Sequence, residues 1–436
     1  MKTGFLPARW RFLIVTPSYL PCVSGAVAFV EAMARRLVSE NRDVTVLTTG
    51  ARQATDFWRP PAVASTPLPV RETVDGVTVE RLSLCYPWPA PYTFGLLRRA
   101  GHWLQHSGLP STVQLPLLKV LARWMPPLFA LNPTLDRLVL AADLVQFVES
   151  SWDGLFTATA AAARRYKKPL VVMPLMHLGS ARIQAHFQMA HQVDAMQHAQ
   201  AILALSGREA ATYAQLGVEA ERTHVIRMGI DPTLPVSLVG GGAEFRDRNG
   251  LVSPIVAFLG ANTYDKGAFA LARATARLVL SGFPVTLVCA GPESARLTAF
   301  VATQPHEIQE ALAGRLHVLG VVDEPTKHRL LAACTLLALP SQVDTFGIVL
   351  LEAWLHGKPV IGANAGGIPE VVQDGETGLL VPFGDVEALA TAVRCLVESP
   401  VLAAQLGEAG RQQVLRRYTW DRTYQTLNDI YATVLQ

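Results

Sequence analysis

Two acids, Asp344 and Glu352, lie eight positions apart on either side of an expected helix start. Asp344 should lie just ahead of the helix and Glu352 about two turns inside it. The backbone N–H groups near Gly347, Ile348 and Val349 would then lie between the acids, where a helix N-terminus binds phosphate. The carboxylates can accept hydrogen bonds from sugar hydroxyls on either side. Hydroxyl, phosphate, hydroxyl is the layout of a nucleotide sugar.

The segment 340–382 resembles the retaining GT-B glycosyltransferases of glycosyltransferase family 4 (glycosyl transferases group 1). Their signature is two Glu separated by seven residues, then G-x-P-V and G-G-I-P-E. Here the first Glu is replaced by Asp344, one methylene shorter, whereas GKPV at 357–360 and GGIPE at 366–370 are intact. An ordinary βα unit with two surface acids is the alternative interpretation.

The resemblance implies a GT-B fold, in which two Rossmann-like, doubly wound α/β domains flank an interdomain cleft. It implies transfer of a sugar from a nucleoside diphosphate sugar to an acceptor, with retention of anomeric configuration. Glu352 would hold the ribose hydroxyls and Asp344 the sugar hydroxyls, while Lys266 and the 347–349 N–H groups would hold the diphosphate. The leaving phosphate would take the acceptor proton, and no cofactor is expected.

Lys266 lies in GANTYDKG, just past the first expected strand of the second domain. The family has G-R-x-x-x-x-K-G here, with both cations on the diphosphate, but the Arg position is Ala261. A missing cation should slow departure of the leaving group. Asn262 and Thr263 are expected to compensate by donating neutral hydrogen bonds. The alternative is that Lys266 is a solvated lysine at a helix start.

Two further residues match family positions near the donor. Gly25 follows Ser24 after the first strand, where the family has a Gly-Gly loop that lets backbone N–H groups approach a phosphate. His177 ends a strand, where the family has a His facing the donor sugar. A lone His is as often a satisfied structural residue, so both interpretations of His177 stay open.

Three more residues complete the expected donor site. Gly320 and Val322, after LHVLG, match the segment that flanks the nucleotide base. Backbone groups there would bind the base edge while apolar side chains cover its face; a plain strand-end turn is the alternative. Phe346 precedes the helix start and is expected to contact the donor.

No metal site is expected. The sequence contains no D-x-D, the pair that metal-dependent glycosyltransferases of the other main fold use on the diphosphate. His186, His191 and His198 do not share one helical face and are expected on helix surfaces. The five cysteines are scattered without C-x-x-C, and Cys289 and Cys334 lie in apolar runs, which favours reduced core residues and a cytoplasmic protein.

Length and composition predict two α/β domains. The chain has 436 residues, 50% hydrophobic and 17% charged, with a net charge of +3, too small to indicate nucleic-acid binding. The apolar run after Arg11 is short, broken by Pro17 and without a small-residue cleavage site, so a first strand is expected instead of a signal peptide. The sequence contains no run of about 18 uncharged apolar residues, so no membrane-spanning helix is expected.

Alternating strand and helix patterns divide the chain into four parts. Residues 1–232 are expected to form the acceptor-side domain and 253–417 the nucleotide-sugar domain. The Gly- and Pro-rich 233–252 reads as a linker. An amphipathic helix over 418–436 would pack back on the first domain, as the resemblance implies.

The acceptor is the open question. The stretch 86–136 matches nothing specific in the family and contains LLRRAGHWL and LLKVLARWMPPLF. Basic residues beside Trp and Leu on short helices can lie in a membrane interface, which is compatible with a lipid-linked acceptor and peripheral contact with the inner membrane face. An amphipathic helix that covers the sheet is the alternative.

Two other functions stay open on the sequence alone. The replacements at Ala261 and Asp344 are compatible with a non-catalytic relative that binds a nucleotide sugar or a partner. Another GT-B enzyme, such as a nucleotide-sugar epimerase, is the second alternative, although the GGIPE order disfavours it. A pyridoxal-dependent phosphorylase would need a longer chain.

Overall fold

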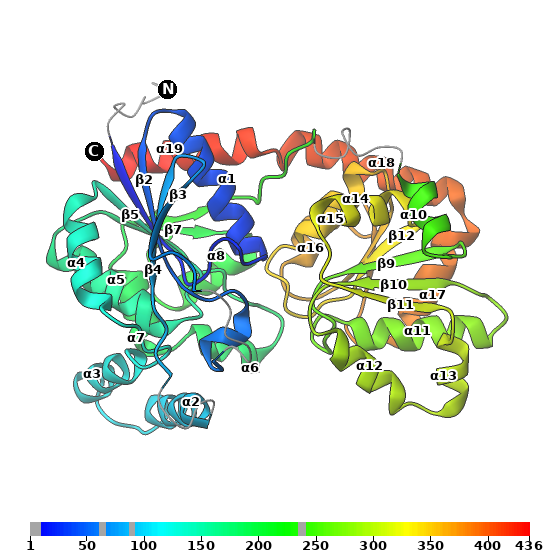
Figure 1. Cartoon of the computed structure of the whole chain (residues 1–436), viewed down its shortest axis with the longest axis horizontal. Helices are drawn as coiled ribbons and strands as arrows, with labels where there is room; N and C mark the ends of the chain where they lie inside the picture. The colour runs from blue at the N-terminus through cyan, green and yellow to red at the C-terminus, as the bar shows by residue number, and fades with distance from the viewer. Residues whose placement is uncertain (1–9, 61–66, 87–91, 234–240) are drawn as a thin grey trace. The chain divides into compact units, whose positions relative to one another are not determined.

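The computed structural model describes residues 10–60, 67–86, 92–233 and 241–436, which form two compact units. Unit 1 comprises Met1–Met176, Arg182–Ile226 and Thr423–Gln436, and unit 2 comprises His177–Ala181 and Arg227–Arg422. In each unit, helices flank a central sheet (Figure 1). The prediction of two doubly wound α/β folds is confirmed.

The sheet of unit 1 has eight strands in the order β3-β4-β2-β1-β5-β6-β7-β8. All neighbouring pairs are parallel except β3–β4, a hairpin that the sequence analysis missed. The inner strands are buried, as expected for a sheet covered on both faces. The strands are β1 Arg11–Val15, β2 Asp43–Thr49, β3 Arg71–Val74, β4 Val77–Leu82, β5 Leu144–Val148, β6 Leu170–Met173, β7 Ala201–Ala204 and β8 Thr223–Val225.

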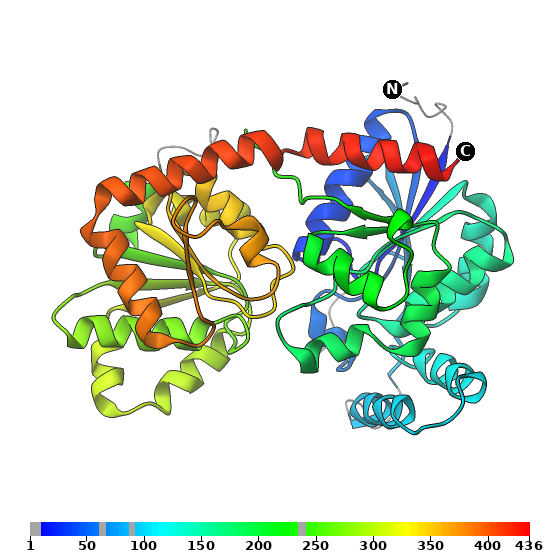
Figure 2. The ribbon, with the colours of Figure 1, turned by 180° about the vertical axis from the view of Figure 1, so that it is seen from behind.

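Helices α2 and α3 of unit 1 lie beyond the helices that cover the sheet, at one end of the unit in both views (Figures 1 and 2). They belong to the stretch 86–136, of which 87–91 lie outside the described residues. The helices of this unit are α1 Gly25–Ser39, α2 Tyr92–Gln105, α3 Ser111–Ala122, α4 Leu131–Ala141, α5 Asp153–Arg165, α6 Ala181–Gln184, α7 Ala190–Gln197 and α8 Gly207–Gln215, with short 3-10 turns η1 Ala54–Phe57, η2 Ala185–Phe187 and η3 Ala220–Arg222.

The sheet of unit 2 is parallel throughout, in the order β11-β10-β9-β12-β13-β14. Its strands are β9 Ile255–Leu259, β10 Thr286–Ala290, β11 Leu316–Gly320, β12 Leu336–Leu339, β13 Val360–Ala363 and β14 Leu379–Val381. Its helices are α10 Gly242–Arg248, α11 Ala268–Leu280, α12 Ser294–Ala302, α13 His306–Leu312, α14 Glu324–Ala333, α15 Ile348–Leu355, α16 Ile368–Val371, α17 Val386–Glu398 and α18 Pro400–Arg417. Within the described residues, no helix is long and apolar enough to cross a membrane.

Part of the expected linker 233–252 is structured. Residues 234–240 lie outside the described residues, but α10 packs against α14 and its Phe245 is 9% exposed. A Cβ on Gly242 would lie 2.9 Å from the carbonyl carbon of Ala332, which shows how closely the two helices approach. Gly242 therefore belongs to a helix contact, which composition alone could not separate from a flexible linker.

The chain from Arg227 onward groups with unit 2, earlier than the expected boundary at 232. The N–H of Ile230 donates to the Tyr418 carbonyl at 2.7 Å, so this segment runs beside the end of α18. Helix α19 (Trp420–Val434) then contributes residues from Thr423 onward to unit 1. There Tyr431 is fully buried, with its ring 5.4 Å from that of Phe12.

Candidate active site

An ion pair joins two loops at the carboxyl edge of the unit 2 sheet. Lys266 follows β9 and Asp344 follows the neighbouring β12, and Lys266 Nζ lies 3.2 Å from Asp344 Oδ1. Burial acts to raise the pKa of Asp344, but the Lys266 charge and hydrogen bonds from Ser341 and Lys266 leave that pKa lowered. Asp344 Oδ2 is buried without a hydrogen-bond partner among the described residues. The site therefore holds an ionised carboxylate beside a cation, with one carboxylate oxygen that lacks a hydrogen-bond donor among the described residues.

The GGIPE motif holds the Asp344 loop in place. Gly366 has φ of +60°, and a Cβ there would lie 2.5 Å from the Asp344 carbonyl oxygen. A Cβ on Gly367 would lie 1.9 Å from the Thr345 carbonyl oxygen, and the Gly367 N–H donates to the Asp344 carbonyl at 2.7 Å. Only glycine allows this approach of two backbones. The motif thus acts by positioning Asp344.

The Lys266 loop corrects one expectation. Asn262 is fully buried, and its Nδ2 donates to the carbonyls of Gly291 and Pro292 at 3.1 and 3.0 Å. Its amide is therefore committed to the backbone and does not stand ready to donate to a diphosphate. Asn262 Oδ1 and Thr263 Oγ1 are buried without partners in the described chain, so Thr263 keeps an available hydroxyl.

Glu352 lies in the second turn of α15 and pairs with a residue that the sequence analysis missed. Its Oε1 lies 2.6 Å from Nζ of Lys327 on α14, and Lys327 also contacts Glu324 at 2.7 Å. Burial, opposed by Lys327, raises the pKa of Glu352, which is only 8% exposed. Glu352 Oε2 is buried with no hydrogen-bond partner in the described part of the chain. Lys327 is 25 positions away in the sequence, so no local spacing indicates the pair.

The start of α15 lies between these acids. Gly347 is its N-cap with φ of +81°, and Ile348 and Val349 form the first turn, whose N–H groups have no intrahelical acceptor. Phe346 is 3% exposed, and its ring packs edge-on against that of Tyr418 at 5.5 Å. The Phe346 side chain is therefore a core group, and only its backbone is free to line the helix start.

His177 belongs to a short segment that groups with unit 2. Its Nδ1 lies 2.7 Å from the Val343 carbonyl, which requires Nδ1 to carry the proton. Burial first, and then the Lys266 charge, lowers the pKa of His177, so the ring is neutral at pH 7. A Cβ on Gly179 would lie 2.0 Å from the Gln342 carbonyl oxygen, so this segment packs closely on the loop that carries Asp344.

The residues expected around the base end β11. Gly320 has φ of +74°, and its carbonyl accepts a hydrogen bond from the Gly291 N–H at 2.7 Å. Val321 is exposed and Val322 is half-buried. A glycine with positive φ and an accessible apolar side chain are thus present at the same sheet edge as Lys266.

Gly25 belongs to unit 1, as the first residue of α1. Ser24 replaces the first glycine of the family loop, and its side chain accepts a hydrogen bond from the Val27 N–H at 3.2 Å. Ser24 is therefore the N-cap of α1, a role that favours serine over glycine. Gly25 is exposed and has an ordinary negative φ.

Glu149, at the carboxyl end of β5, is a second residue that the sequence analysis missed. It has φ of +73°, rare for a side chain other than glycine. Burial raises the pKa of Glu149 to about 7, against hydrogen bonds from Ser151, Ser18 and Trp152. A strained carboxyl with a shifted pKa at this edge marks a functional candidate. An acid directly after a buried strand was the available signal.

The histidine expectation needs one correction. His191 is fully buried in α7, with Nε2 3.3 Å from Asp153 Oδ2, so it is no surface residue. Its position on the inner face of α7 follows from contacts with α5, which spacing to the other histidines does not reveal. Within the described residues, no group of three or more His, Cys, Asp and Glu side chains could hold a metal ion.

Two family models match the chain. The model described as Glycosyltransferase Family 4 matches residues 23–234, and the model described as Glycosyl transferases group 1 matches residues 253–399. Alpha-maltose-1-phosphate synthase of Mycolicibacterium smegmatis is 32% identical over 276 residues, which cover 60% of this chain and 70% of that protein. D-inositol 3-phosphate glycosyltransferase of Xylanimonas cellulosilytica is 34% identical over 249 residues, 53% of this chain and 56% of that protein.

Solved structures share the fold along nearly the whole chain. Anabaena HepE, solved in complex with UDP, has a TM-score of 0.69 at 21% identity and covers 97% of this chain and 100% of its own. The same protein has also been solved with UDP-glucose, with a TM-score of 0.66 at 20% identity, covering 97% of this chain and 99% of that one.

Proposed function

The chain belongs to glycosyltransferase family 4 and is a glycosyltransferase that uses a nucleotide sugar, and from this premise we propose how its own residues bind the donor and transfer the sugar. One observation carries the proposal. Asp344 Oδ2 and Glu352 Oε2 are buried acceptors without partners among the described residues, on either side of the α15 N-terminus. Such atoms cost free energy unless a ligand satisfies them.

The diphosphate lies against the first turn of α15 and Lys266. Lysine has three N–H donors, and one of them reaches Asp344, so two remain for phosphate oxygens. The N–H groups of Ile348 and Val349 add hydrogen bonds along the helix dipole. Ala261 supplies no second cation, so Lys266 carries the leaving-group charge within this loop.

The two acids bind hydroxyls on opposite sides of the diphosphate. Glu352 accepts from the ribose through Oε2, while Lys327 holds Oε1 and fixes the carboxylate. Asp344 accepts from a sugar hydroxyl, and its lowered pKa keeps it ionised for that task. Neutral His177, whose Nδ1–H is used on Val343, adds a polar contact at the sugar.

Transfer proceeds with retention of anomeric configuration. The bond from the anomeric carbon to the diphosphate oxygen breaks, and its electron pair stays on that oxygen beside Lys266. The acceptor oxygen bonds to the same face of the anomeric carbon, and its proton passes to a diphosphate oxygen. The chain supplies charge stabilisation and positioning, which account for most of the rate in such reactions.

The donor is proposed to be a uridine diphosphate sugar. Support comes from HepE, a structural neighbour whose complexes contain UDP and UDP-glucose. Gly320 and Val322 would flank the base, with Val322 against its face. UDP-glucose is accordingly the first donor to test, with GDP- and ADP-glucose as competitors.

Glu149 of unit 1 is proposed to bind a hydroxyl of the acceptor. With a pKa of about 7, Glu149 can accept a hydrogen bond when ionised or donate one when protonated. A lipid-linked acceptor and peripheral contact with the inner face of a membrane are proposed on the composition of 86–136. Donor hydrolysis in water needs none of these acceptor groups.

Calorimetric titration with UDP tests the donor site. Glu352→Gln should weaken binding by about tenfold, because a charged hydrogen bond contributes about 1.5–3 kcal/mol. Glu324→Gln is the matched control, since it removes another acid that touches Lys327 but leaves the ribose acceptor in place. Equal affinities for wild type and Glu352→Gln, with measurable UDP binding in both, would refute the assignment.

A further inference from the structure

Helix α2 exposes an apolar stripe on the side away from the rest of unit 1. Tyr92, Leu96 and Trp103 are between 62% and 72% exposed, and Arg99 lies on the same stripe. Their spacing of four, three and four residues places all of them on one helical face. A face of this kind is ordinarily buried against protein, so its exposure requires an explanation.

Helix α3 and the residue just after its C-cap repeat the same pattern. Val113, Leu117, Val120 and Trp124 are between 44% and 53% exposed, at the same spacing of four, three and four residues. Both stripes end in a tryptophan, the residue whose amphipathic ring favours the membrane–water interface. The two matched stripes lie on helices that contact each other, and together they are here named the α2–α3 surface.

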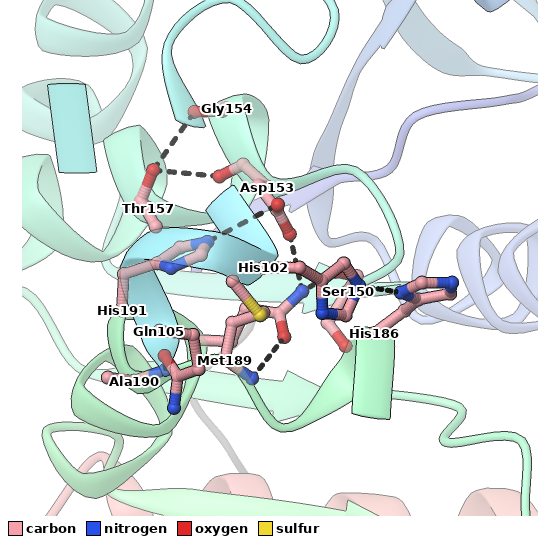
Figure 3. A network of polar contacts seen from close by, with 11 residues as sticks. His102, Gln105, Ser150, Asp153, Gly154, Thr157, His186, Met189, Ala190 and His191 are labelled. Carbon is pink, nitrogen blue, oxygen red and sulfur yellow. Dashed lines mark hydrogen bonds and ion pairs between the residues drawn. The ribbon is translucent and has the colours of Figure 1, made fainter. Parts of the chain in front are cut away.

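The opposite faces of both helices are fixed to unit 1. Figure 3 shows His102 of α2 pointing toward His186, with the facing ring nitrogens 2.6 Å apart, and Gln105 near Ala190, whose N–H donates to Gln105 Oε1 at 3.1 Å. Leu104 and Leu118 bury themselves against Met189. Because each stripe lies opposite these anchors, the α2–α3 surface faces away from the unit.

Gln114 joins the two helices into one rigid hairpin. Its side-chain nitrogen Nε2 donates to the carbonyls of Leu104 and Gln105, each at 2.9 Å. Gln114, in the first turn of α3, thereby provides hydrogen-bond donors for two carbonyls in the last turn of α2. The exposed stripes are therefore held by a packed and hydrogen-bonded base. This preorganisation lowers the entropy cost of docking.

The charge of this region complements an anionic surface. Residues 86–135 contain four basic residues and no Asp or Glu. Arg99 lies on the α2 stripe, and Arg123 precedes Trp124 and makes no ion pair among the described residues. Basic residues near an anionic lipid surface strengthen binding to it.

A groove lined in part by α3 has the charge to bind a phosphate-bearing headgroup. A cavity of about 470 Å³ lies among α3, α4, α5 and α7, with Lys119 and Arg123 from α3 and its C-cap and Arg164 and Arg165 from α5 on its wall. Asp194 pairs with Lys119 at 2.7 Å and Asp136 with Arg165 at 3.2 Å, so the four cations exceed the two acids. The groove is therefore net positive.

We propose that the α2–α3 surface docks on an anionic phospholipid bilayer, with its stripes in the interface and a headgroup phosphate in the groove lined in part by α3. This docking deepens the membrane contact proposed above for 86–136 and rests on that part of the proposed function, whereas it does not depend on the identity of the donor. The tryptophans enter the headgroup boundary, and Arg99 and Arg123 pair with lipid phosphates. Neutral lipid supplies the apolar contact but lacks the net negative charge.

Flotation of the full chain with vesicles tests the proposal. Phosphatidylcholine vesicles are compared with vesicles containing equal parts of phosphatidylcholine and phosphatidylglycerol, each at low and high salt. The protein should float with the mixed vesicles at low salt and release at high salt, because screening weakens the charge attraction. Absence of flotation with mixed vesicles at low salt overturns the proposal.

Paired variants assign the contact to this surface. Trp103→Ala with Trp124→Ala should lower the partition coefficient by about tenfold or more, since two large apolar side chains leave the interface. Leu280→Ala with Val401→Ala, at exposed positions of unit 2, should leave it unchanged. Arg99→Gln with Arg123→Gln should abolish the preference for anionic vesicles, against Arg411→Gln as control. Equal losses in the test and control variants overturn the proposal.

Two further measurements separate the outcomes. Hydrolysis of UDP-glucose without vesicles should be the same for wild type and the Trp103→Ala, Trp124→Ala variant, so loss of flotation with intact hydrolysis leaves the donor site unaffected. Flotation without any hydrolysis would refute the proposed donor and leave docking in place. A dimer in sedimentation that the same two substitutions dissolve, without flotation, would assign the surface to a second copy and overturn lipid docking.

Discussion

The carboxyl edge of the unit 2 sheet and the α2–α3 surface of unit 1 both hold side chains in environments that are unfavourable for them, but in opposite senses. The edge of unit 2 buries charges and pairs each one, as in Lys266–Asp344 and Lys327–Glu352. The α2–α3 surface exposes apolar side chains such as Trp103. Both arrangements are costly for the isolated protein. We propose that a binding partner offsets each cost, a polar ligand in the first case and an apolar interface in the second.

In each region, the residues that maintain the fold differ from those proposed to bind a partner. In unit 2 the glycines of GGIPE, Gly366 and Gly367, fix the backbone while the acids keep one oxygen open. In unit 1, Leu104 and Leu118 fix the hairpin while the stripes stay free. Substitutions of functional groups should therefore change activity or docking more than stability, and substitutions of fixing groups the reverse.

Lys266→Ala should have the largest effect. Turnover of UDP-glucose should fall by about 10²–10³, because a preorganised group at the developing charge contributes that much. Arg411→Ala, from an exposed ion pair with Glu408, is the control and should leave turnover unchanged. Steady-state kinetics at saturating donor measure both. A Lys266→Ala enzyme with wild-type turnover would remove the assigned role.

Lys327→Met sharpens the comparison at the second buried pair. Loss of the cation removes the influence that lowers the pKa of Glu352, so that pKa rises further and a smaller share of Glu352 is ionised at a given pH. UDP affinity should fall by about tenfold at pH 7 and recover as the pH rises and Glu352 ionises. Calorimetry across pH measures this. Parallel pH profiles for wild type and variant would contradict the positioning role.

The parts of the proposed donor site that sequence motifs could suggest are those that are local in sequence. Asp344, Gly347 and Glu352 share one loop–helix segment, and the parallel sheet brings the ends of β9 and β12 together, so Lys266 could be expected nearby. Lys327 could not, because its contact with Glu352 depends on how α14 packs beside α15. The hydrogen bonds that the Asn262 amide donates to Gly291 and Pro292 likewise could not be predicted, because no local pattern specifies the positions of those carbonyls.

The fold was predictable where patterns are strong and incomplete where they are weak. The alternation of strands and helices expected over 1–232 and 253–417 matches the observed element order in its main features. The β3–β4 hairpin was missed although Asp75-Gly76, both with positive φ, forms its turn, because the preceding strand is only four residues long. Helix α10 was missed because its glycines resemble a linker until Gly242 is seen against Ala332.

Glu149→Gln tests a buried carboxyl that lacks a cationic partner among the described hydrogen bonds. The pKa of Glu149 is about 7 in the folded protein, above its ordinary value, so the folded state binds a proton that the unfolded state releases. Stability is thus full below the ordinary pKa and is lost as the pH rises toward 7. The variant should raise the melting temperature relative to wild type at pH 8 and change it little at pH 4. A pH-independent difference would contradict the raised pKa.

The smallest expected effect is that of Trp103→Ala on stability. Trp103 is 72% exposed, so its loss should change the free energy of unfolding by about 0.5 kcal/mol or less. Leu118→Ala, 1% exposed on the anchored face of α3, should cost about 2–5 kcal/mol through its cavity. Urea denaturation followed by circular dichroism compares the two. A large loss for Trp103→Ala would mean that the α2–α3 surface stabilises the fold by itself, and its stripes would no longer need a lipid partner to explain them.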